Sequence, residues 1–431
     1  MARVLLLMST RTYRAKAFLQ AARRLGVEVV VGSERRQALA SKARNTTLAV
    51  DLRRPDRAAR GIAQFARQRP LDAVVGVDDD TIVLAAMAAK ALGLPHNSVD
   101  AVRAANDKYR TRRRLAKAGL PSPRFKRISI DADPITASRK VWYPCVLKPV
   151  ALAASRGVIR ADDRAQFVDA FGRIRAMLLA DRGGQRQLLV ESFIPGAEVA
   201  VEGLLVDGSL RMLALFDKPD PLDGPYFEET IYVTPSRLPV AVQKAIERTT
   251  ARGAEVLGLC DGPLHAELRL GEGGPFVVEL AARSIGGLCS NTLRFGTGLS
   301  LEEVILKHAI GEPLGSVERE RRAAGVMMLP IPRAGRLREV RGREQAEQVP
   351  GIEEVAITLP LGQPVVPLPE GDRYLGFVFA RGPTPEEVEA ALREAHRRLG
   401  FVIVTPGEED ESECVQASPA PRLLPVVPSP S

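Results

Sequence analysis

Residues 264–280 read LHAELRLGEGGPFVVEL, with alternating apolar runs on either side of a Gly-rich segment. This pattern predicts a β-hairpin in which residues 271–275 form a five-residue loop. If the hairpin closes symmetrically about Gly273, Glu267 lies directly opposite Glu279 on one face, with Cβ atoms about 5 Å apart. Two facing carboxylates repel one another, so they are either solvated by water or bridged by a divalent cation, such as Mg²⁺ bound to nucleotide phosphates.

Downstream of the hairpin, Arg283 follows four residues after Glu279 and is itself followed by Ser284-Ile285-Gly286-Gly287. A planar guanidinium matches phosphate oxygens bidentately. Arg283 is therefore a candidate to hold a transferred phosphoryl group or an acyl phosphate.

Two lysines upstream are candidates to meet nucleotide phosphates. Lys108 opens a predicted helix and Lys148 ends a predicted strand, although a lysine in either place also occurs as an ordinary surface residue. The small-residue loop after Lys148, which includes Ser155 and Gly157, is of a kind that places backbone N–H groups over phosphates. The signature Gly-x-x-x-x-Gly-Lys-Ser/Thr is absent, so a nucleotide would have to be held in another way.

The first 105 residues are predicted to form an open parallel-sheet α/β domain. Apolar runs at 4–8, 27–31 and 71–77 alternate with helical patterns at 13–25 and 81–92. The first apolar run is followed by Ser9-Thr10-Arg11 rather than by a Gly-x-Gly-x-x-Gly turn. Dinucleotide binding is therefore disfavoured.

The pattern changes to α+β after residue 105. We predict a domain over 106–321 and a small C-terminal α+β domain over 322–405, which ends with a helix over 385–399. Residues 406–431 begin with an acidic run and continue rich in Pro and Ser, which predicts a disordered tail.

Composition is that of a soluble multidomain protein: 45% of the 431 residues are hydrophobic and 26% are charged. No apolar run reaches the ~18 residues of a spanning helix, and no secretion signal is evident, so we predict a cytoplasmic protein without membrane contacts. The net charge of +9 raises the question of nucleic acid binding. Because basic and acidic residues are interleaved and only 5% of residues are aromatic, we predict no nucleic acid partner.

In their order along the chain, these motifs resemble those of the ATP-grasp superfamily, and the resemblance covers nearly the whole sequence. It implies a two-lobed ATP-grasp domain that lies between the N-terminal and C-terminal domains in the chain. This domain would bind ATP with Mg²⁺, or with Mn²⁺ in its place. The segment from Glu191 to Glu198 is similar to the family's hinge. The implied nucleotide-binding and metal-binding residues are Lys108, Lys148, Ser155, Gly157, Glu191, Ser192, Phe193, Ile194, Glu198, Glu267, Glu279 and Arg283.

The resemblance also implies a role for each group. The two lysines would neutralise the α- and β-phosphates, Glu267 and Glu279 would hold the metal, and Arg283 would hold the transferred phosphate. The backbone around Glu191 to Ile194 would meet the adenine edge, and Glu198 would accept the ribose hydroxyls.

Two features depart from the family pattern. Many members carry Glu-x-Asn-x-Arg, whereas Ala281 occupies the Asn position here, which leaves open whether one or two metal ions bind. The small-residue loop after Lys148, which is similar to the family's flexible phosphate lid, has Ala151-Leu152-Ala153-Ala154 where glycines are frequent, which should stiffen it.

Within the superfamily, Ser284-Ile285-Gly286-Gly287 and the C-terminal domain look like the L-amino-acid ligases rather than the biotin-dependent carboxylases, which have Gln-Val-Glu after the arginine. This resemblance implies a carboxylate–amine ligase with small-molecule carboxylate and amine substrates. Gly286 and Gly287 would border the substrates, and Glu228 or Glu229 would pair with a substrate ammonium, unless these glutamates belong to a solvated hairpin.

Three alternatives stay open: an ATP-dependent carboxylase, a ligase of a non-amino-acid carboxylate, and a nucleotide-binding protein without turnover. The sequence does not decide the oligomeric state, and a homodimer is one option.

Overall fold

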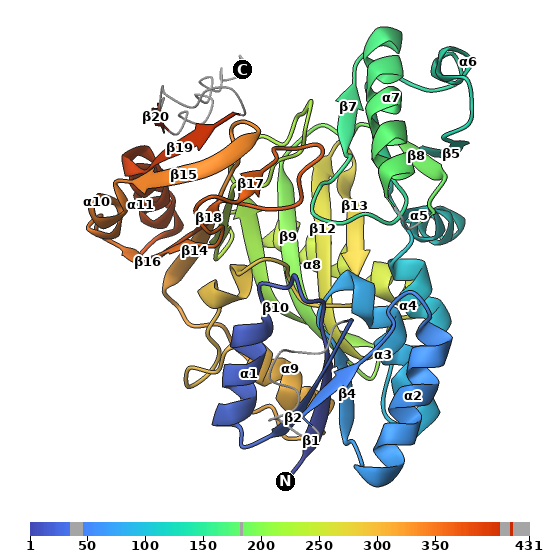
Figure 1. Ribbon diagram of the computed structural model, residues 1–431, viewed down its shortest axis with the longest axis vertical. Coiled ribbons are helices and arrows are strands. Elements are labelled where there is room, and N and C mark those ends of the chain that lie inside the picture. Colours follow the sequence, from blue (N-terminus) through green and yellow to red (C-terminus); the bar gives the residue numbers. More distant parts are fainter. Residues whose placement is uncertain (35–45, 182–183, 406–413, 417–431) are drawn as a thin grey trace.

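The computed structural model describes residues 1–34, 46–181, 184–405 and 414–416, which form four sheets flanked by helices (Figure 1). Most of the predicted disordered tail lies outside these residues. Cys414–Gln416 is an exception, because this segment forms strand β20 and pairs with β19 (Gly400–Val404), so the prediction of a disordered tail is wrong there. Within the described residues, no helix has the length and apolar character needed to cross a bilayer.

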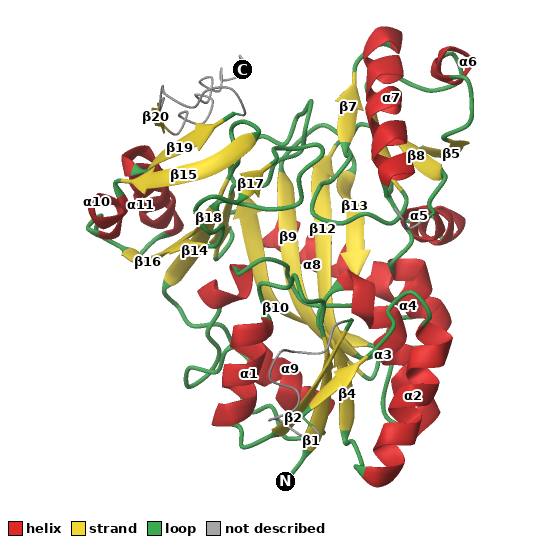
Figure 2. Cartoon of the chain, viewed as in Figure 1, coloured by secondary structure: helices red, strands yellow, loops and turns green. Residues whose placement is uncertain are grey.

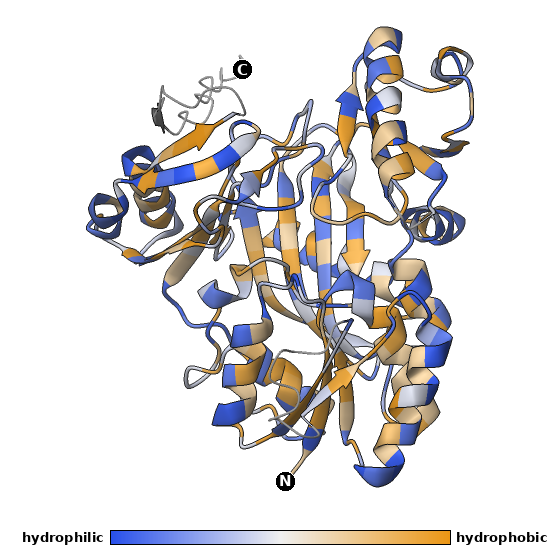
Figure 3. Ribbon diagram, viewed as in Figure 1, coloured by the Kyte–Doolittle hydropathy of each residue, from blue (hydrophilic) through white to orange (hydrophobic). Residues whose placement is uncertain are grey.

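The N-terminal part is a parallel sheet with helices on both faces, as the sequence predicts (Figure 2). Alternate side chains of its first strand point to opposite faces. Val4 and Leu6 join the apolar cluster of α1 (Ala15–Arg24) and α9 (Leu301–Ala309), whereas Leu5 and Leu7 join that of α2 (Pro55–Gln68) and α3 (Asp79–Leu92). Figure 3 shows mainly hydrophobic residues on β1 and β4. The elements are β1 (Arg3–Leu7), α1 (Ala15–Arg24), β2 (Glu28–Ser33), β3 (Thr47–Ala49), α2 (Pro55–Gln68), β4 (Ala73–Gly76) and α3 (Asp79–Leu92), in sheet order β3-β2-β1-β4.

A smaller antiparallel sheet with order β5-β8-β6-β7 forms the small lobe. Phe167 and Phe171 of α7 pack against Leu147 and Val190 of this sheet. Its elements, with the two preceding helices, are α4 (Val99–Ala105), α5 (Lys108–Lys117), β5 (Phe125–Ser129), α6 (Pro134–Ser138), β6 (Cys145–Pro149), β7 (Ile159–Ala161), α7 (Arg164–Ala180) and β8 (Gln187–Ser192).

The large sheet is antiparallel, with order β13-β12-β9-β10-β11-β14-β18-β16. It crosses the predicted boundary at residues 321–322, because β14 pairs with β11 on one side and with β18 on the other. Its elements, with the neighbouring helices, are β9 (Glu198–Val206), β10 (Ser209–Lys218), β11 (Ile231–Thr234), α8 (Val240–Leu257), β12 (Gly262–Gly271), β13 (Gly274–Ala281), η1 (Cys289–Thr292), α9 (Leu301–Ala309), β14 (Ala323–Leu329), β16 (Ile352–Ile357) and β18 (Gly376–Gly382).

The fourth sheet, of order β17-β15-β19-β20, completes the C-terminal part. The helix predicted over 385–399 is observed as α11, which packs its apolar side against β14 and β18. The remaining elements are β15 (Gly335–Arg341), α10 (Arg343–Glu347), β17 (Pro364–Val365) and α11 (Pro385–Arg398).

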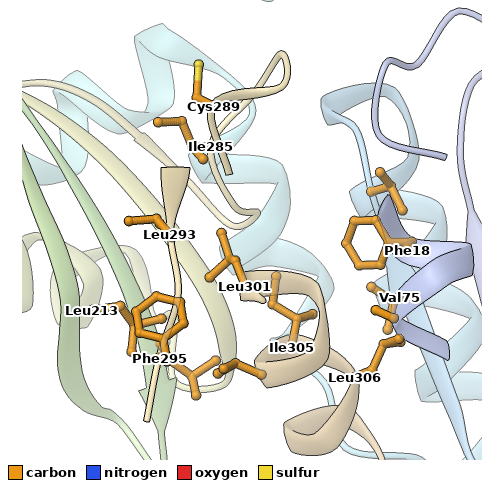
Figure 4. Close-up of a cluster of buried hydrophobic side chains, with 14 of the residues drawn as sticks. Phe18, Val75, Leu213, Ile285, Cys289, Leu293, Phe295, Leu301, Ile305 and Leu306 are labelled. Atoms are coloured by element: carbon orange, nitrogen blue, oxygen red, sulfur yellow. The ribbon is translucent and has the colours of Figure 1, made fainter. Parts of the chain in front are cut away.

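One apolar core joins the N-terminal part to the large sheet (Figure 4). Phe18 and Val75 lie on one side of this cluster and Leu213 and Phe295 on the other, with Ile305 of α9 between them. Because the cluster is continuous and closely packed, the N-terminal helices are held in a fixed position relative to the strands of the large sheet.

His396 provides a pH-dependent test of how α11 packs in the C-terminal part. Burial lowers the pKa of His396 to about 4, against the opposing effect of Asp220. Between pH 6.5 and 4 the folded protein then binds fewer protons than the unfolded chain, so stability falls as the pH falls through this window.

We expect wild type to lose about 2 kcal/mol more unfolding free energy between pH 7 and pH 5 than His396→Leu, at ~1.36 kcal/mol per pKa unit. Urea unfolding at the two pH values measures this difference. Equal losses in the two proteins would contradict the placement of a neutral His396 in the folded state.

Candidate active site

The hairpin β12–β13 pairs Glu267 with Glu279, as the sequence predicts, but its turn and its strand register differ from those expected. The connection is a two-residue turn, Glu272-Gly273, so the expectation of a five-residue loop is wrong. The register set at the turn pairs Leu268 with Val277, and on its own it would place Glu279 one residue out of line with Glu267. A β-bulge at Val278 shifts the register by one residue and restores the pairing.

The bulge is supported from the small lobe. The carbonyl of Val278 accepts a hydrogen bond from the guanidinium of Arg112, and the N–H of Val277 donates to Pro121 O at 3.2 Å. The irregular backbone is therefore satisfied, and the position of Glu279 depends on contacts outside the hairpin.

Lys218, at the end of β10, lies at the centre of a group of carboxylates. Its Nζ atom is 2.8 Å from Glu198, 2.7 Å from Glu229 and 3.0 Å from Glu267. Oxygens of these three glutamates lie within 4.8 Å of one another. Burial opposes the charged form of Lys218, but the three carboxylates raise its pKa well above the ordinary value.

Sequence reasoning missed Lys218 because it treated residues 216–219 as part of a turn-rich stretch. The chain has only eleven lysines, so a lysine that ends an apolar strand was the available signal. The sequence also did not reveal that these groups meet, because Glu198, Lys218 and Glu267 lie on three different strands.

The carboxylates of this cluster have different proton affinities. Burial, together with the nearby Glu267 carboxylate, raises the pKa of Glu229 to about 7 against the effect of Lys218. Burial also opposes ionisation of Glu267, but Lys218 and His265 hold the pKa of that carboxyl well below its usual range. Burial raises the pKa of Glu228 to about 7.

Lys108 and Glu279 form the other half of the site. Lys108 Nζ is 3.5 Å from Glu279 and donates to the carbonyl of Leu152 at 2.9 Å. Leu152 belongs to the loop of residues 150–158 between β6 and β7, which we call the phosphate lid. Asp79, Lys108, Glu279 and the lid residues Ala151–Ala153 are among the residues that line a cavity of about 20 Å³.

Two lid residues named by the sequence have left-handed backbones: Ser155 has φ 53° and Gly157 has φ 72°. A Cβ atom at Gly157 would lie 2.9 Å from the ring of Pro149, so the close turn requires glycine.

The hinge segment is held firmly by its neighbours. Glu191 is buried and accepts from Lys148 Nζ at 2.6 Å and from Arg112 Nε at 2.6 Å. Burial and the nearby Arg112 lower the pKa of Lys148, although Glu191 opposes this change. The N–H of Ser192 donates to Arg124 O at 2.8 Å and that of Phe193 donates to Pro144 O at 3.1 Å.

The ring of Phe193 lies beneath two guanidinium groups, of Arg160 at 4.2 Å and of Arg269 at 4.8 Å from the ring centroid. Ile194, the next residue of the segment, lies beside Gly271 of β12. The assignment of adenine contacts to this segment remains a prediction.

Arg283 is held by a residue that the sequence did not reveal. Its guanidinium forms a bidentate pair with Asp79 on α3, with Nε–Oδ1 2.9 Å and Nη2–Oδ2 2.8 Å. Burial opposes the charge of Arg283, but Asp79 and Glu279 raise its pKa. The two residues are 204 positions apart, so no local pattern could connect them.

Of the predicted substrate residues, Glu229 belongs to the acidic cluster around Lys218, whereas Gly287 contacts the C-terminal part. The N–H of Ile285 donates to the buried carboxylate of Glu202 at 2.9 Å, which fixes the loop that contains Gly286 and Gly287. A Cβ atom at Gly287 would lie 3.0 Å from the ring of Phe377. Burial, with Glu229 and Glu228 nearby, raises the pKa of Tyr374 well above its usual value.

These side chains fit a divalent metal ion. Glu198, Glu229 and Glu267 place carboxylate oxygens within 4.8 Å of one another, and Glu279 is paired with Glu267 across the hairpin. Besides the two lysines, the basic groups near them are His265, 3.7 Å from Glu267, Arg269, 3.7 Å from Glu198, and Arg283, 4.0 Å from Glu279. Carboxylate oxygens are the ligands that Mg²⁺ prefers. The side chain of Ala281 offers no ligand atom.

The Arg283–Asp79 pair makes a testable contribution to stability. Asp79→Asn keeps the size of the side chain but leaves the buried guanidinium without its counter-charge. We expect this variant to lose about 1–3 kcal/mol of unfolding free energy, measured by urea denaturation. Asp80→Asn is the matched control, because Asp80 is exposed and forms no ion pair within the described part of the chain; equal losses in both variants would refute the pairing.

Three family models match the chain. The ATP-grasp domain matches residues 141–292, the ATP-grasp N-terminal domain matches 19–96, and the L-amino acid ligase C-terminal domain 2 matches 327–404.

Two curated relatives carry ligase or synthase names. Alanine–anticapsin ligase of Bacillus subtilis (strain 168) is 28% identical over 263 residues, which cover 57% of this chain and 55% of that protein. Carnosine synthase 1 of Homo sapiens is 27% identical over 406 residues, which cover 89% of this chain and 49% of that protein. The chain thus spans about half the length of these relatives.

Solved structures cover the chain more completely. An L-amino acid ligase from Bacillus licheniformis superposes with a TM-score of 0.79 and 26% identity, over 94% of this chain and 99% of that chain. A carboxyaminoimidazole ribonucleotide synthase from Aspergillus clavatus, solved in complex with ATP, has a TM-score of 0.70 and 17% identity over 91% of this chain and 97% of that chain, and shares the fold. The chain belongs to the ATP-grasp superfamily and carries a C-terminal domain of the L-amino acid ligase type.

Proposed function

We propose that this protein is an ATP- and Mg²⁺-dependent carboxylate–amine ligase that forms an amide bond through an acyl phosphate, with an amino acid as one substrate. The observation that carries the proposal is the hairpin pair Glu267 and Glu279 beside the ammonium groups of Lys218 and Lys108. The similarity to an L-amino acid ligase over nearly the whole chain supports the amino-acid substrate.

In this proposal the nucleotide lies between the small lobe and the large sheet. Lys108 and Lys148 neutralise its phosphates, the lid residues Ser155 and Gly157 cover them, and residues 191–194 meet the adenine. Glu191 keeps the ammonium of Lys148 in place. Glu198 accepts the ribose hydroxyls, so its contact with Lys218 would be shared with the nucleotide.

Glu267 and Glu279 are the residues that would hold the metal. When bound, Mg²⁺ neutralises phosphate charge in phosphoryl transfer and helps to align the reacting oxygens. Because Ala281 supplies no ligand, we favour one tightly held ion, with Mn²⁺ as a substitute.

The first step transfers the γ-phosphoryl group. A carboxylate oxygen of the substrate attacks the γ-phosphorus, the bond to the β-phosphate oxygen breaks, and ADP leaves. Arg283 is fixed by Asp79 and would hold the transferred phosphate, while Lys218 adds a second positive charge near it. The contribution of the protein here is positioning and charge neutralisation.

The second step forms the amide. The amine nitrogen attacks the carbonyl carbon of the acyl phosphate, the C–O bond to phosphate breaks, inorganic phosphate leaves with the electron pair, and the amine gives up a proton. Glu228 or Glu229 would pair with the ammonium of an amino-acid substrate, and Gly286 and Gly287 would leave room for it.

The metal assignment is tested by ADP release in the presence of ATP, Mg²⁺ and amino acids supplied singly and in pairs. Wild type should release ADP only with a substrate present. Glu279→Gln should release it ~10²–10³-fold more slowly, because a carboxylate aimed at the metal–phosphate complex is lost.

Glu272→Gln is the matched control, because Glu272 lies exposed in the turn of the same hairpin. Unchanged ADP release by Glu279→Gln would remove the metal assignment. Stabilisation by ATP with no acid able to support ADP release would instead indicate a nucleotide-binding protein without turnover.

A further inference from the structure

The outer end of the phosphate lid is tied to the C-terminal part of the chain. The N–H of Gly157 donates to Pro369 O at 2.8 Å, and Nε of Arg156 donates to Glu370 O at 3.1 Å. Both acceptors lie in the segment Pro367–Asp372 between β17 and β18, which we call the strap. Two consecutive lid residues are thus bonded to one short segment from another part of the fold.

The strap also bonds helix α7 of the small lobe. The carboxylate of Glu370 forms a bidentate pair with Arg173 on α7, with Nε–Oε1 3.0 Å and Nη2–Oε2 2.8 Å. Arg173 lies over the ring of Tyr226, 5.2 Å from its centroid, and donates to the hydroxyl of that residue. Glu370 therefore bonds the lid through its carbonyl and α7 through its carboxylate.

The strap is itself well anchored. The N–H of Gly371 donates to Pro367 O at 2.8 Å, and a Cβ atom at Gly371 would lie only 2.0 Å from Val366 O, so the loop is folded tightly at a glycine. Asp372 forms an ion pair with Arg11 of the N-terminal part. These contacts give the strap a fixed base from which to hold the lid.

The inner end of the lid contacts the candidate active site through Lys108. Lys108 bonds the carbonyl of Leu152, and the cavity beneath has about 20 Å³, which is room for one or two water molecules. If the nucleotide phosphates contact Lys108, as in the proposed function, a nucleotide can enter or leave this cavity only when the lid moves. Any contact that holds the outer end of the lid opposes this motion.

From these contacts we infer that the C-terminal strap holds the phosphate lid closed, and that Glu370 is a positioning residue for the lid through its pair with Arg173. The inference rests on the proposed function for its consequence in turnover: a closed lid keeps water away from the acyl phosphate, so ATP consumption stays coupled to amide formation. Glu370 touches no reacting atom in this scheme.

The Glu370–Arg173 pair is 39% and 41% exposed at its two side chains, so either residue can be changed without opening the core. A pair of this exposure should shift the closing equilibrium of the lid by about two- to fivefold.

Amide hydrogen exchange of the peptide that contains residues 150–158 tests the strap without reference to turnover. Glu370→Gln and Arg173→Gln should each speed exchange of this peptide about two- to fivefold, with an unchanged melting temperature. The reversed pair, Arg173→Glu with Glu370→Arg, should restore slow exchange. Asp131→Asn is the matched control, because its ion pair with Arg186 is similarly exposed but touches neither lid nor strap.

Exchange in Glu370→Gln equal to wild type, or equally fast exchange in Asp131→Asn, would overturn the inference. A second readout is the ratio of ADP released to amide formed, which should rise in Glu370→Gln and stay at the wild-type value in Asp131→Asn. If wild type releases no ADP with any acid, the proposed function fails, whereas the exchange measurement still decides whether the strap holds the lid.

Discussion

The concentration of negative charge from Glu198, Glu267 and Glu279 on strands β9, β12 and β13, together with Glu229 just before β11, is the constraint on which the rest of the site depends. Carboxylates removed from bulk water are unfavourable unless positive groups or hydrogen bonds compensate them. Lys218 lies among three of these carboxylates and Lys108 is placed beside the fourth, so both lysines are committed to charge balance before any ligand arrives. In the proposed function, a nucleotide with its metal ion would therefore have to change these ion pairs when it binds.

The need to balance buried charge also explains why the site is assembled from distant parts of the chain. The arginine that follows the hairpin needs its own counter-charge, and Asp79 supplies it from a helix of the N-terminal sheet. This contact requires the two parts to be held at a fixed distance, which the shared apolar core provides. The orientation of the Arg283 guanidinium thus depends on the packing of the apolar core that joins the two parts.

Several helices and the acidic pair of the hairpin could be predicted from the sequence. Helical patterns located α3, α5 and α11, and the acidic pair on the hairpin could be matched because its residues are close in sequence. The bulge at Val278 could not be read, because it depends on Arg112 from another lobe. Asp79 was missed for the same reason, because its partner Arg283 is 204 residues away. For Lys218 the sequence offered a local signal, a rare lysine at the end of an apolar strand, but not its three carboxylate partners, which the fold brings together. The pairing of β11 with β14, which carries one sheet past residue 321, is also a long-range choice.

That pairing has a consequence for any attempt to isolate residues 1–321. A fragment that ends at residue 321 would leave the backbone N–H and C=O groups along one side of β11 without partners, and a bare strand edge is prone to self-association. It would also lose Val388 and Leu392 of α11, which belong to the same apolar cluster as Ile231 and Val233 of β11. The C-terminal part is therefore built into the scaffold and cannot be treated as a detachable accessory.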